Sequence, residues 1–182
     1  MADFTMFRKD TVLYRVVLGN PLIIYYGHLQ IRDPVVKRGN INSGFTEEEE
    51  MAMAEHAKEL DARRMRGPKP KPEDFEKDVL DKIAQMVEPD LTIATNLHKM
   101  IKEIAPGLTS RTWYGIPAYE KNGSVLCFFQ ERRKFKTRYA TVGFSDKAKL
   151  DNGPIWPTTF AVVEWNQEVS KRLKELITKA IS

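Results

Sequence analysis

Between Thr109 and Phe144 the chain alternates short runs of aromatic and β-branched residues with residues that favour turns. Asn122-Gly123 separates two of these runs. This dipeptide is the strongest short-range signal for a β-hairpin, because a type I′ turn requires positive φ at both of its central residues. We therefore expect an antiparallel β-meander here, followed by one further strand. The expected strands cover residues 113–121, 124–131, 136–144 and 158–164.

Apolar residues at helical spacing flank the expected meander on both sides. Before it, one helix ends at Glu88-Pro89-Asp90, where Pro89 suits the first position of the next helix. That next helix ends at Pro106-Gly107, and Asn166 caps a last helix after the strands. This order predicts an α+β fold, a two-layer sandwich with N-terminal helices, an antiparallel β-meander and a C-terminal helix.

Two segments precede the expected core domain, which covers residues 73–182. Residues 43–67 contain an appended helix, because Thr46 is a good N-cap and Glu49 is placed as its capping-box partner. Residues 68–72 alternate Pro and Lys and form a stiff linker, since each proline removes a donor and restricts the residue before it.

Residues 1–42 hold two apolar runs that Arg15 and Asn20-Pro21 interrupt. A membrane-spanning helix needs about 20 predominantly apolar residues in succession, so we expect no membrane span in this segment. We interpret it as an extension of uncertain structure: a hairpin around Gly19-Asn20-Pro21, sequence outside the functional domain, or a segment that is not part of the native protein. Our hypothesis is the last of these. The native chain is expected to begin between Val35 and Ser43, and the intact mass of protein from the source cell tests this expectation.

Composition and charge limit the class of protein. The 182 residues are 42% hydrophobic and 30% charged, which is typical of a globular domain and excludes wholesale disorder. The net charge of +4 favours anionic partners, but it is too small to make nucleic acid an expected partner. The one cysteine, Cys127, cannot form an internal disulfide, so we expect a reducing, cytoplasmic location.

Four motifs resemble those of a known family. They are RTWYGIPAY (Arg111–Tyr119), CFFQ (Cys127–Gln130), KFKTRYATVGFSD (Lys134–Asp146) and IWPTTFAV (Ile155–Val162). In this order they resemble the YdhG-like domain family, which was long described as a domain of unknown function and is related in fold to frataxin. The resemblance covers about residues 43–182 and is most specific over residues 109–160.

The resemblance implies a helix–antiparallel sheet–helix sandwich. For at least one branch of the family it also implies an iron-chaperone role, in which Fe²⁺ is bound transiently and delivered to a protein partner in cofactor assembly. The chain departs from the compact family core because it carries the helix expected at residues 45–66 and everything before it.

An acidic helix face is the candidate metal site. Iron handling of the frataxin kind uses carboxylate oxygens along the first core helix, which hold the metal weakly enough to release it. Asp74, Asp78 and Asp81 are spaced i, i+4 and i+7 and therefore share one helix face. The alternative is an ordinary solvated face. Lys77 and Lys82 interleave with the acids, and acids near a helix N-terminus complement the helix dipole.

The cations near the end of the meander form a second candidate site. Alternation along a strand would place Lys134, Lys136 and Arg138 on one face and the residues between them on the other. Cations beside aromatic rings suit a phosphorylated ligand or a single-stranded nucleic acid. The alternative is a sheet with one solvated and one buried face, which needs no ligand.

Large aromatic residues supply a third candidate. Such residues usually serve the core, and that is the default interpretation of Trp113, Tyr114, Tyr119 and Trp156. The segment Trp113–Pro117 also has the composition of a shaped turn, which with Lys134 or Lys136 would line a pocket for a small anion. The candidate ligand-binding residues are Trp113, Tyr114, Tyr119, Lys134, Lys136, Arg138 and Trp156.

Sequence motifs of catalysis are missing from the chain. It has no Gly-rich phosphate loop, nucleophile elbow or paired-histidine motif, and we expect a protein that is not an enzyme. The leading prediction is binding of labile iron through the acidic helix for delivery to a partner. The alternative is an adaptor that binds a small anion, a protein or a nucleic acid through the basic, aromatic face of the sheet.

Overall fold

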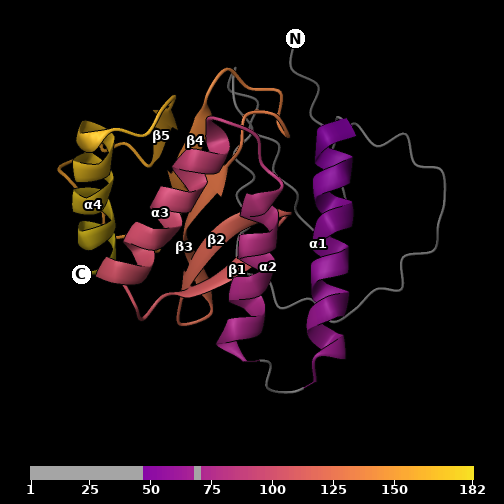
Figure 1. Cartoon of the computed structure of the whole chain (residues 1–182). Helices are drawn as coiled ribbons and strands as arrows, with labels where there is room; N and C mark the ends of the chain where they lie inside the picture. Colours follow the sequence, from indigo (N-terminus) through magenta and orange to yellow (C-terminus); the bar gives the residue numbers. More distant parts are fainter. Residues whose placement is uncertain (1–46, 68–70) are drawn as a thin grey trace, which may run out of the picture. The chain divides into compact units, whose positions relative to one another are not determined.

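A computed structural model describes residues 47–67 and 71–182, which belong to the compact unit Gly44–Ser182. In chain order the elements are α1 (Glu47–Met65), α2 (Pro72–Ala84), α3 (Asp90–Ile104), β1 (Thr109–Trp113), β2 (Ile116–Lys121), β3 (Ser124–Gln130), β4 (Ala140–Phe144), β5 (Thr159–Val162) and α4 (Gln167–Ile181) (Figure 1). The strands form one sheet in the order β1-β2-β3-β4-β5, with every neighbouring pair antiparallel. The fold is therefore α+β, as the sequence predicts. The extension expected at residues 1–42 lies outside the described residues.

The main core lies between the sheet and the helices α2, α3 and α4, which cover one of its faces (Figure 1). The apolar side chains that the helices contribute include Val79, Ile83, Ile93, Leu97, Ile101, Leu173 and Ile177. The sheet meets them with Tyr119, Leu126, Phe129 and Val142. Complete burial of one such aliphatic or aromatic side chain stabilises the fold by roughly 1.5–3 kcal/mol. The helical spacing seen in the sequence is therefore the spacing of the core.

The first hairpin differs from the prediction. The sequence predicts one strand over residues 113–121, but the structure has two strands, β1 and β2, joined at Tyr114-Gly115. Both turn residues have positive φ, 54° for Tyr114 and 72° for Gly115. The composition of residues 113–117 indicates a turn, but tyrosine rarely takes such a conformation, so a hairpin turn centred on Tyr114 is not expected. The second hairpin turns at Asn122-Gly123, where φ is 53° and 80°, as predicted.

The strand predicted over residues 136–144 is also shorter than expected. β4 begins at Ala140, and residues 131–139 form a loop in which Lys136 has φ of 51°. Two backbone bonds close this loop, from the N–H of Thr137 to the carbonyl of Arg132 at 2.9 Å and from Lys136 to Arg133 at 3.4 Å. The predicted strand face made of Lys134, Lys136 and Arg138 therefore does not exist.

Buried Asp90 fixes the start of the 131–139 loop. Its side chain is 1% exposed and accepts hydrogen bonds from the backbone N–H and from Nε of Arg132, both at 2.7 Å. A guanidinium Nε–H and a carboxylate form a charge-assisted bond that is both strong and directional. This contact holds the loop after β3 against the first turn of α3.

The second face of the sheet carries a smaller apolar cluster. Ile116, Ala118 and Phe128 are buried there, and Trp113 and Phe135 pack against them. The Phe128 ring lies over Gly143, its partner on the neighbouring strand, and a Cβ at position 143 would come within 2.2 Å of the ring. Gly143 is therefore a packing requirement of this cluster.

Cys127 of β3 is enclosed in the core. The thiol is 2% exposed, and burial raises its pKa to about 12. Because the thiolate is the reactive form of cysteine, this side chain is inert at neutral pH.

α1 differs from the other helices in how it is attached. Its first turn is Glu47–Glu50, and Ala52 is its one buried residue among those described. Met51 and Met65 are 53% and 88% exposed, so polar contacts, and not apolar burial, hold this helix. α2 begins at Pro72, one residue before the domain boundary expected from the sequence. Within the part of the chain that the structure describes, no helix has both the length and the apolar character to cross a membrane.

Candidate functional site

The turn between β1 and β2 binds a glutamate side chain of α1. The backbone N–H of Tyr114 donates to Oε2 of Glu59 at 3.1 Å, and the N–H of Gly115 donates to Oε1 at 2.7 Å. Consecutive amides that converge in a turn form a small anion-binding concavity. The left-handed backbone at both residues aims these two amides at one carboxylate.

Gly115 also leaves room for a second carboxylate. A Cβ at this position would lie 1.9 Å from Oε2 of Glu55 and 2.3 Å from Nζ of Lys134. Lys134 Nζ donates to the carbonyl of Tyr114 at 2.9 Å and also forms an ion pair with Glu55. The Lys134 side chain is only 16% exposed, so this ammonium group is well shielded from solvent.

Glu55 lies between two ammonium groups. Nζ of Lys82, on α2, donates to Oε1 of Glu55 at 2.7 Å, while Lys134 approaches from the loop. Burial alone would raise the pKa of Glu55, but the hydrogen bonds from Lys134 and Lys82 outweigh it and the net pKa is lowered. The carboxylate is therefore held in its charged form.

Glu59 has a comparable environment. His56 Nδ1 lies 3.2 Å from Oε2 of Glu59, and the His56 ring stacks on the Tyr114 ring with centroids 4.0 Å apart. Burial would raise the pKa of Glu59, but the bonds with His56 and with the Gly115 amide outweigh it, so the pKa is lowered. Tyr114 thus supplies both an amide and an aromatic face to the same segment of α1.

Further ion pairs attach the two ends of α1. Glu48 near its start pairs with Lys136, whose side chain is 70% exposed. Arg66, just after its end, binds both carboxylate oxygens of Asp78, each at 2.8 Å. We call the residues that receive the glutamates of α1 the acidic-helix surface. It consists of Lys82, Tyr114, Gly115, Lys134 and Lys136.

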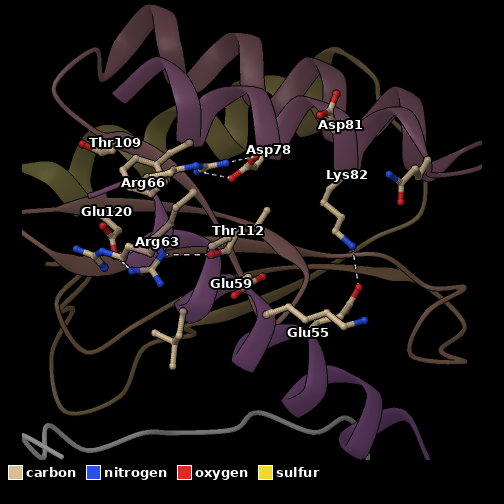
Figure 2. A pocket seen from close by; sticks show the side chains of 16 residues that line it. Glu55, Glu59, Arg63, Arg66, Asp78, Asp81, Lys82, Thr109, Thr112 and Glu120 are labelled. Carbon is tan, nitrogen blue, oxygen red and sulfur yellow. Dashed lines mark hydrogen bonds and ion pairs between the residues drawn. The ribbon is translucent and has the colours of Figure 1, made fainter. Parts of the chain in front are cut away.

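A cavity of about 380 Å³ adjoins this surface between α1, α2 and the β1–β2 hairpin (Figure 2). Its ionisable lining residues carry both signs of charge and include Glu55, Glu59, Asp78, Asp81 and Glu120 together with Lys58, Arg63, Arg66, Lys82 and Arg111. Figure 2 shows Lys82 reaching Glu55 and Arg66 paired with Asp78 at the cavity. Pairing of the charges leaves little net field of either sign in this space.

The three predicted metal ligands lie in different surroundings. Asp74 accepts a hydrogen bond from the backbone N–H of Lys71 at 3.3 Å, Asp78 is bound by Arg66, and Asp81 lines the cavity. Across residues 47–67 and 71–182 no three His, Cys, Asp or Glu side chains gather in a way that could hold a metal ion. Iron binding by these acids remains a prediction.

The structure brings together only some of the predicted ligand-binding residues. Tyr114, Lys134 and Lys136 all contact α1, and the Trp113 ring lies 5.3 Å from that of Tyr114. The other three residues lie elsewhere. Tyr119 is 1% exposed in the main core, Trp156 packs on the same core, and the Arg138 guanidinium lies over the Tyr139 ring.

Buried Tyr119 has a polar partner in the core. Its hydroxyl lies 3.1 Å from Nδ1 of His98, and Nε2 of His98 lies 3.3 Å from Glu76. Tyr119 therefore belongs to a buried hydrogen-bonded chain and not to a ligand pocket, which corrects its assignment from the sequence. Burial lowers the pKa of His98, although the Glu76 charge opposes this.

Sequence reasoning missed the residues that α1 contributes. The sequence patterns assign no role to Glu55 or Glu59, and they place Lys82 among the charges that interleave with the acids of α2. Their only local signal is the spacing of four residues between Glu55 and Glu59, which places the two carboxylates on one face. Their partners are distant in sequence, so no local pattern reveals them.

Comparison with known proteins identifies no relative. No family model, no curated protein and no solved structure matches the chain.

Proposed function

We propose that the protein is a non-catalytic adaptor that binds carboxylate groups at the β1–β2 turn. We further propose that it belongs to the YdhG-like family, with the two-layer sandwich related to frataxin. The order of elements supports this, since two core helices, an antiparallel meander and a final helix follow one another. The motif RTWYGIPAY, one of the four on which the resemblance depends, contains the turn itself.

One observation carries the proposed function. Glu59 places both carboxylate oxygens on consecutive backbone amides, at 3.1 Å from Tyr114 and 2.7 Å from Gly115. Hydrogen bonds to charged groups contribute about 1.5–3 kcal/mol each, and two amides in fixed positions select the planar, bidentate shape of a carboxylate. Lys134 adds a shielded positive charge beside them. An internal carboxylate here shows which chemistry the donors of this turn accept.

Iron delivery is the function that the family resemblance implies, through Asp74, Asp78 and Asp81. A metal ion at Asp78 would have to compete with the bidentate Arg66 guanidinium. Because the turn already holds a carboxylate, whereas Asp74 and Asp78 are bound by other groups of the chain, carboxylate binding is the better supported function. Anaerobic titration of Fe²⁺ against the wild-type chain and the D74N/D78N/D81N variant tests the iron role.

The test of carboxylate binding uses the full chain with Glu55→Gln and Glu59→Gln, called the released chain. The probe is citrate, and the readout is the NMR signals of the Tyr114 and Gly115 amides. We expect saturable shifts at millimolar citrate, because the amides no longer hold a charged partner. Adding Lys134→Met is expected to weaken binding by about tenfold, or about 1.4 kcal/mol.

A matched control is Lys147→Met in the released chain. Lys147 is exposed and pairs with Asp146, away from the turn, so its loss is expected to leave citrate affinity unchanged. Two results would contradict the proposed function. One is the absence of saturable shifts in the released chain, and the other is equal loss of affinity in both lysine variants.

A further inference from the structure

We propose that the acidic-helix surface is a docking site for an acidic helix of a partner protein, and that α1 is an internal competitor for that site. The inference rests on the proposed function, because it uses the same turn amides and Lys134. It goes further by naming the occupant, a helix with carboxylates repeated along one face.

The contacts of α1 define what such a helix must present. Glu48, Ala52, Glu55 and Glu59 follow one another at spacings of four, three and four residues. Residues at these spacings form one continuous stripe along an α-helix. The eleven steps from Glu48 to Glu59 span about 16 Å at 1.5 Å per residue. The surface thus holds glutamates along three turns of one helix face.

Each glutamate of the stripe has its own binding partners. Glu48 pairs with Lys136, and Glu55 pairs with Lys134 and Lys82. Glu59 accepts hydrogen bonds from the two turn amides. These binding partners come from a loop, from α2 and from a hairpin, so the spacing is fixed by tertiary structure. A helix with acids at other spacings would match at most part of the surface.

Ala52 explains why the helix approaches so closely. It is the one buried residue described in α1, at 1% exposure, and it lies in the middle of the stripe. A small residue at this point lets the helix lie close, with Glu48 on Lys136 and Glu55 on Lys134 at either side of it. The recognition pattern is therefore Glu, a small residue, Glu and Glu.

α1 is held weakly enough to be displaced. It buries no large apolar side chain among its described residues, and its pairs with Lys82 and Lys136 are partly exposed. Such pairs contribute only about 0–1 kcal/mol each, so the bonds of Glu59 and the shielded Lys134–Glu55 pair are the contacts that a partner helix must match. α1 competes well only because it is joined to α2 through a short segment, which gives it a high effective concentration. A partner helix that adds apolar contacts to the same carboxylates would replace it.

A second copy of the chain is a poorer candidate than a different protein. The α1 helix of another copy would offer the same contacts as the α1 already present. It would do so at its concentration in solution, whereas the tethered helix acts at an effective concentration in the millimolar range. Displacement therefore requires contacts that α1 itself does not supply.

The test measures binding of a synthetic peptide with the sequence Glu47–Met65 to the released chain and to the wild-type chain. The amide signals of Tyr114 and Gly115 report occupancy. We expect the peptide to bind the released chain about tenfold more tightly than the wild-type chain, where α1 competes. A peptide with Gln at the positions of Glu55 and Glu59 is expected to bind about tenfold more weakly.

Because α1 contributes only Ala52 to the interior among its described residues, the released chain is expected to keep its core, and circular dichroism checks this. The single variant Glu55→Gln provides a second readout, with expected peptide affinity between those of the wild-type and released chains. Citrate binding without peptide binding would overturn the docking site and leave the proposed function standing. Failure of both ligands would overturn both.

Two other results would also overturn the inference. Equal affinity for the glutamate and glutamine peptides would mean that the surface does not recognise carboxylates. Sedimentation of the wild-type chain as a dimer whose helices are exchanged would make a second copy the occupant. One cysteine introduced in α1 and one in the 131–139 loop distinguish the two cases. A disulfide between two chains indicates that copies exchange α1, and a disulfide within one chain indicates docking within that chain.

Discussion

The Glu59 carboxylate accepts a hydrogen bond from the backbone N–H of Gly115 at 2.7 Å, across a separation of 56 residues. The donor is a backbone group in a left-handed turn, so no substitution of its side chain can remove it directly. The acceptor lies on a helix that buries little. The same chain therefore contains a binding site fixed by the backbone and a helix, α1, that is attached to it by polar contacts.

Acid is expected to undock α1. The pKa values of Glu55 and Glu59 are lowered in the docked state, because the hydrogen bonds to both carboxylates outweigh the effect of burial. Their contribution is therefore complete above the ordinary value of 4.5 and is lost as the pH falls through the lowered values. Amide signals of Tyr114 and Gly115, followed from pH 7 to pH 3, should report the change. The released chain, which lacks both carboxylates, should show none of this transition.

Loss of the Lys134 charge should loosen α1 without affecting the core. Lys134→Met removes the ion pair with Glu55 and the bond to the Tyr114 carbonyl. We expect docking to weaken by about 1 kcal/mol, because partly exposed pairs seldom contribute more. Hydrogen exchange of the α1 amides should accelerate, while that of α3 should not. Uniform acceleration in both helices would mean that Lys134 supports the whole fold.

Gly115→Ala and Gly123→Ala form a matched pair. Both glycines have positive φ, 72° and 80°, and each alanine pays a backbone penalty of about 1–2 kcal/mol. A Cβ at position 115 would displace the ends of the Glu55 and Lys134 side chains. A Cβ at position 123 would have no atom within 4 Å. We expect both variants to melt at lower temperature, and only Gly115→Ala to expose α1 to faster hydrogen exchange. Equal exchange in the two variants would contradict the contact.

Gly143→Ala should destabilise the smaller apolar cluster. The added methyl would come within 2.2 Å of the Phe128 ring, and such overpacking costs about 1–3 kcal/mol. Gly107→Ala is the control, because no atom lies within 4 Å of a Cβ there. The free energies of unfolding of the two variants, measured with urea, should differ by at least about 1 kcal/mol. Identical midpoints would show that the ring moves aside freely.

His98 should make the fold less stable in weak acid. Burial lowers its pKa below the ordinary 6.5, against the opposing charge of Glu76, so the folded protein holds it neutral. Between the lowered pKa and 6.5 the unfolded chain binds more protons, and the stability therefore falls as the pH drops through this window. Urea midpoints at pH 7.5 and pH 5.5 should differ more in the wild type than in His98→Gln. The other histidines are present in both proteins, so an equal difference would exclude His98 as the cause.

The sequence predicted the parts of the fold that local patterns encode. Asn122-Gly123 predicted the second hairpin, and apolar spacing predicted the core faces of α3 and α4. The same spacing predicted the core face of α2 except at Leu80 and Val87, which are exposed. The sequence did not reveal β1, because the turn at Tyr114 uses a conformation that tyrosine seldom adopts. It also predicted strand at residue 131 and over residues 136–139, all of which lie in the 131–139 loop. The alternation there is only apparent, because bonds within the loop and the contact from Asp90 to Arg132 set its path.

Only the residues of the turn and the loop in the candidate site were predictable from the sequence, and those of α1 were not. Tyr114 and Lys134 stood out as a turn aromatic and a nearby cation, and both belong to the site. Glu55 and Glu59 did not stand out, since acids on a polar helix are common and their partners are far along the chain. A contact of this kind arises when a helix meets a surface, which requires knowledge of the fold.

Cys127 gives the protein a practical advantage for experiments on α1. Its thiol is buried, with a pKa raised to about 12, and it is the chain's one cysteine. Thiolates add to maleimide reagents, so a cysteine introduced at exposed Met65 would be labelled while Cys127 stays unmodified. A fluorophore attached there would follow each opening of the helix on single molecules of an otherwise unaltered protein.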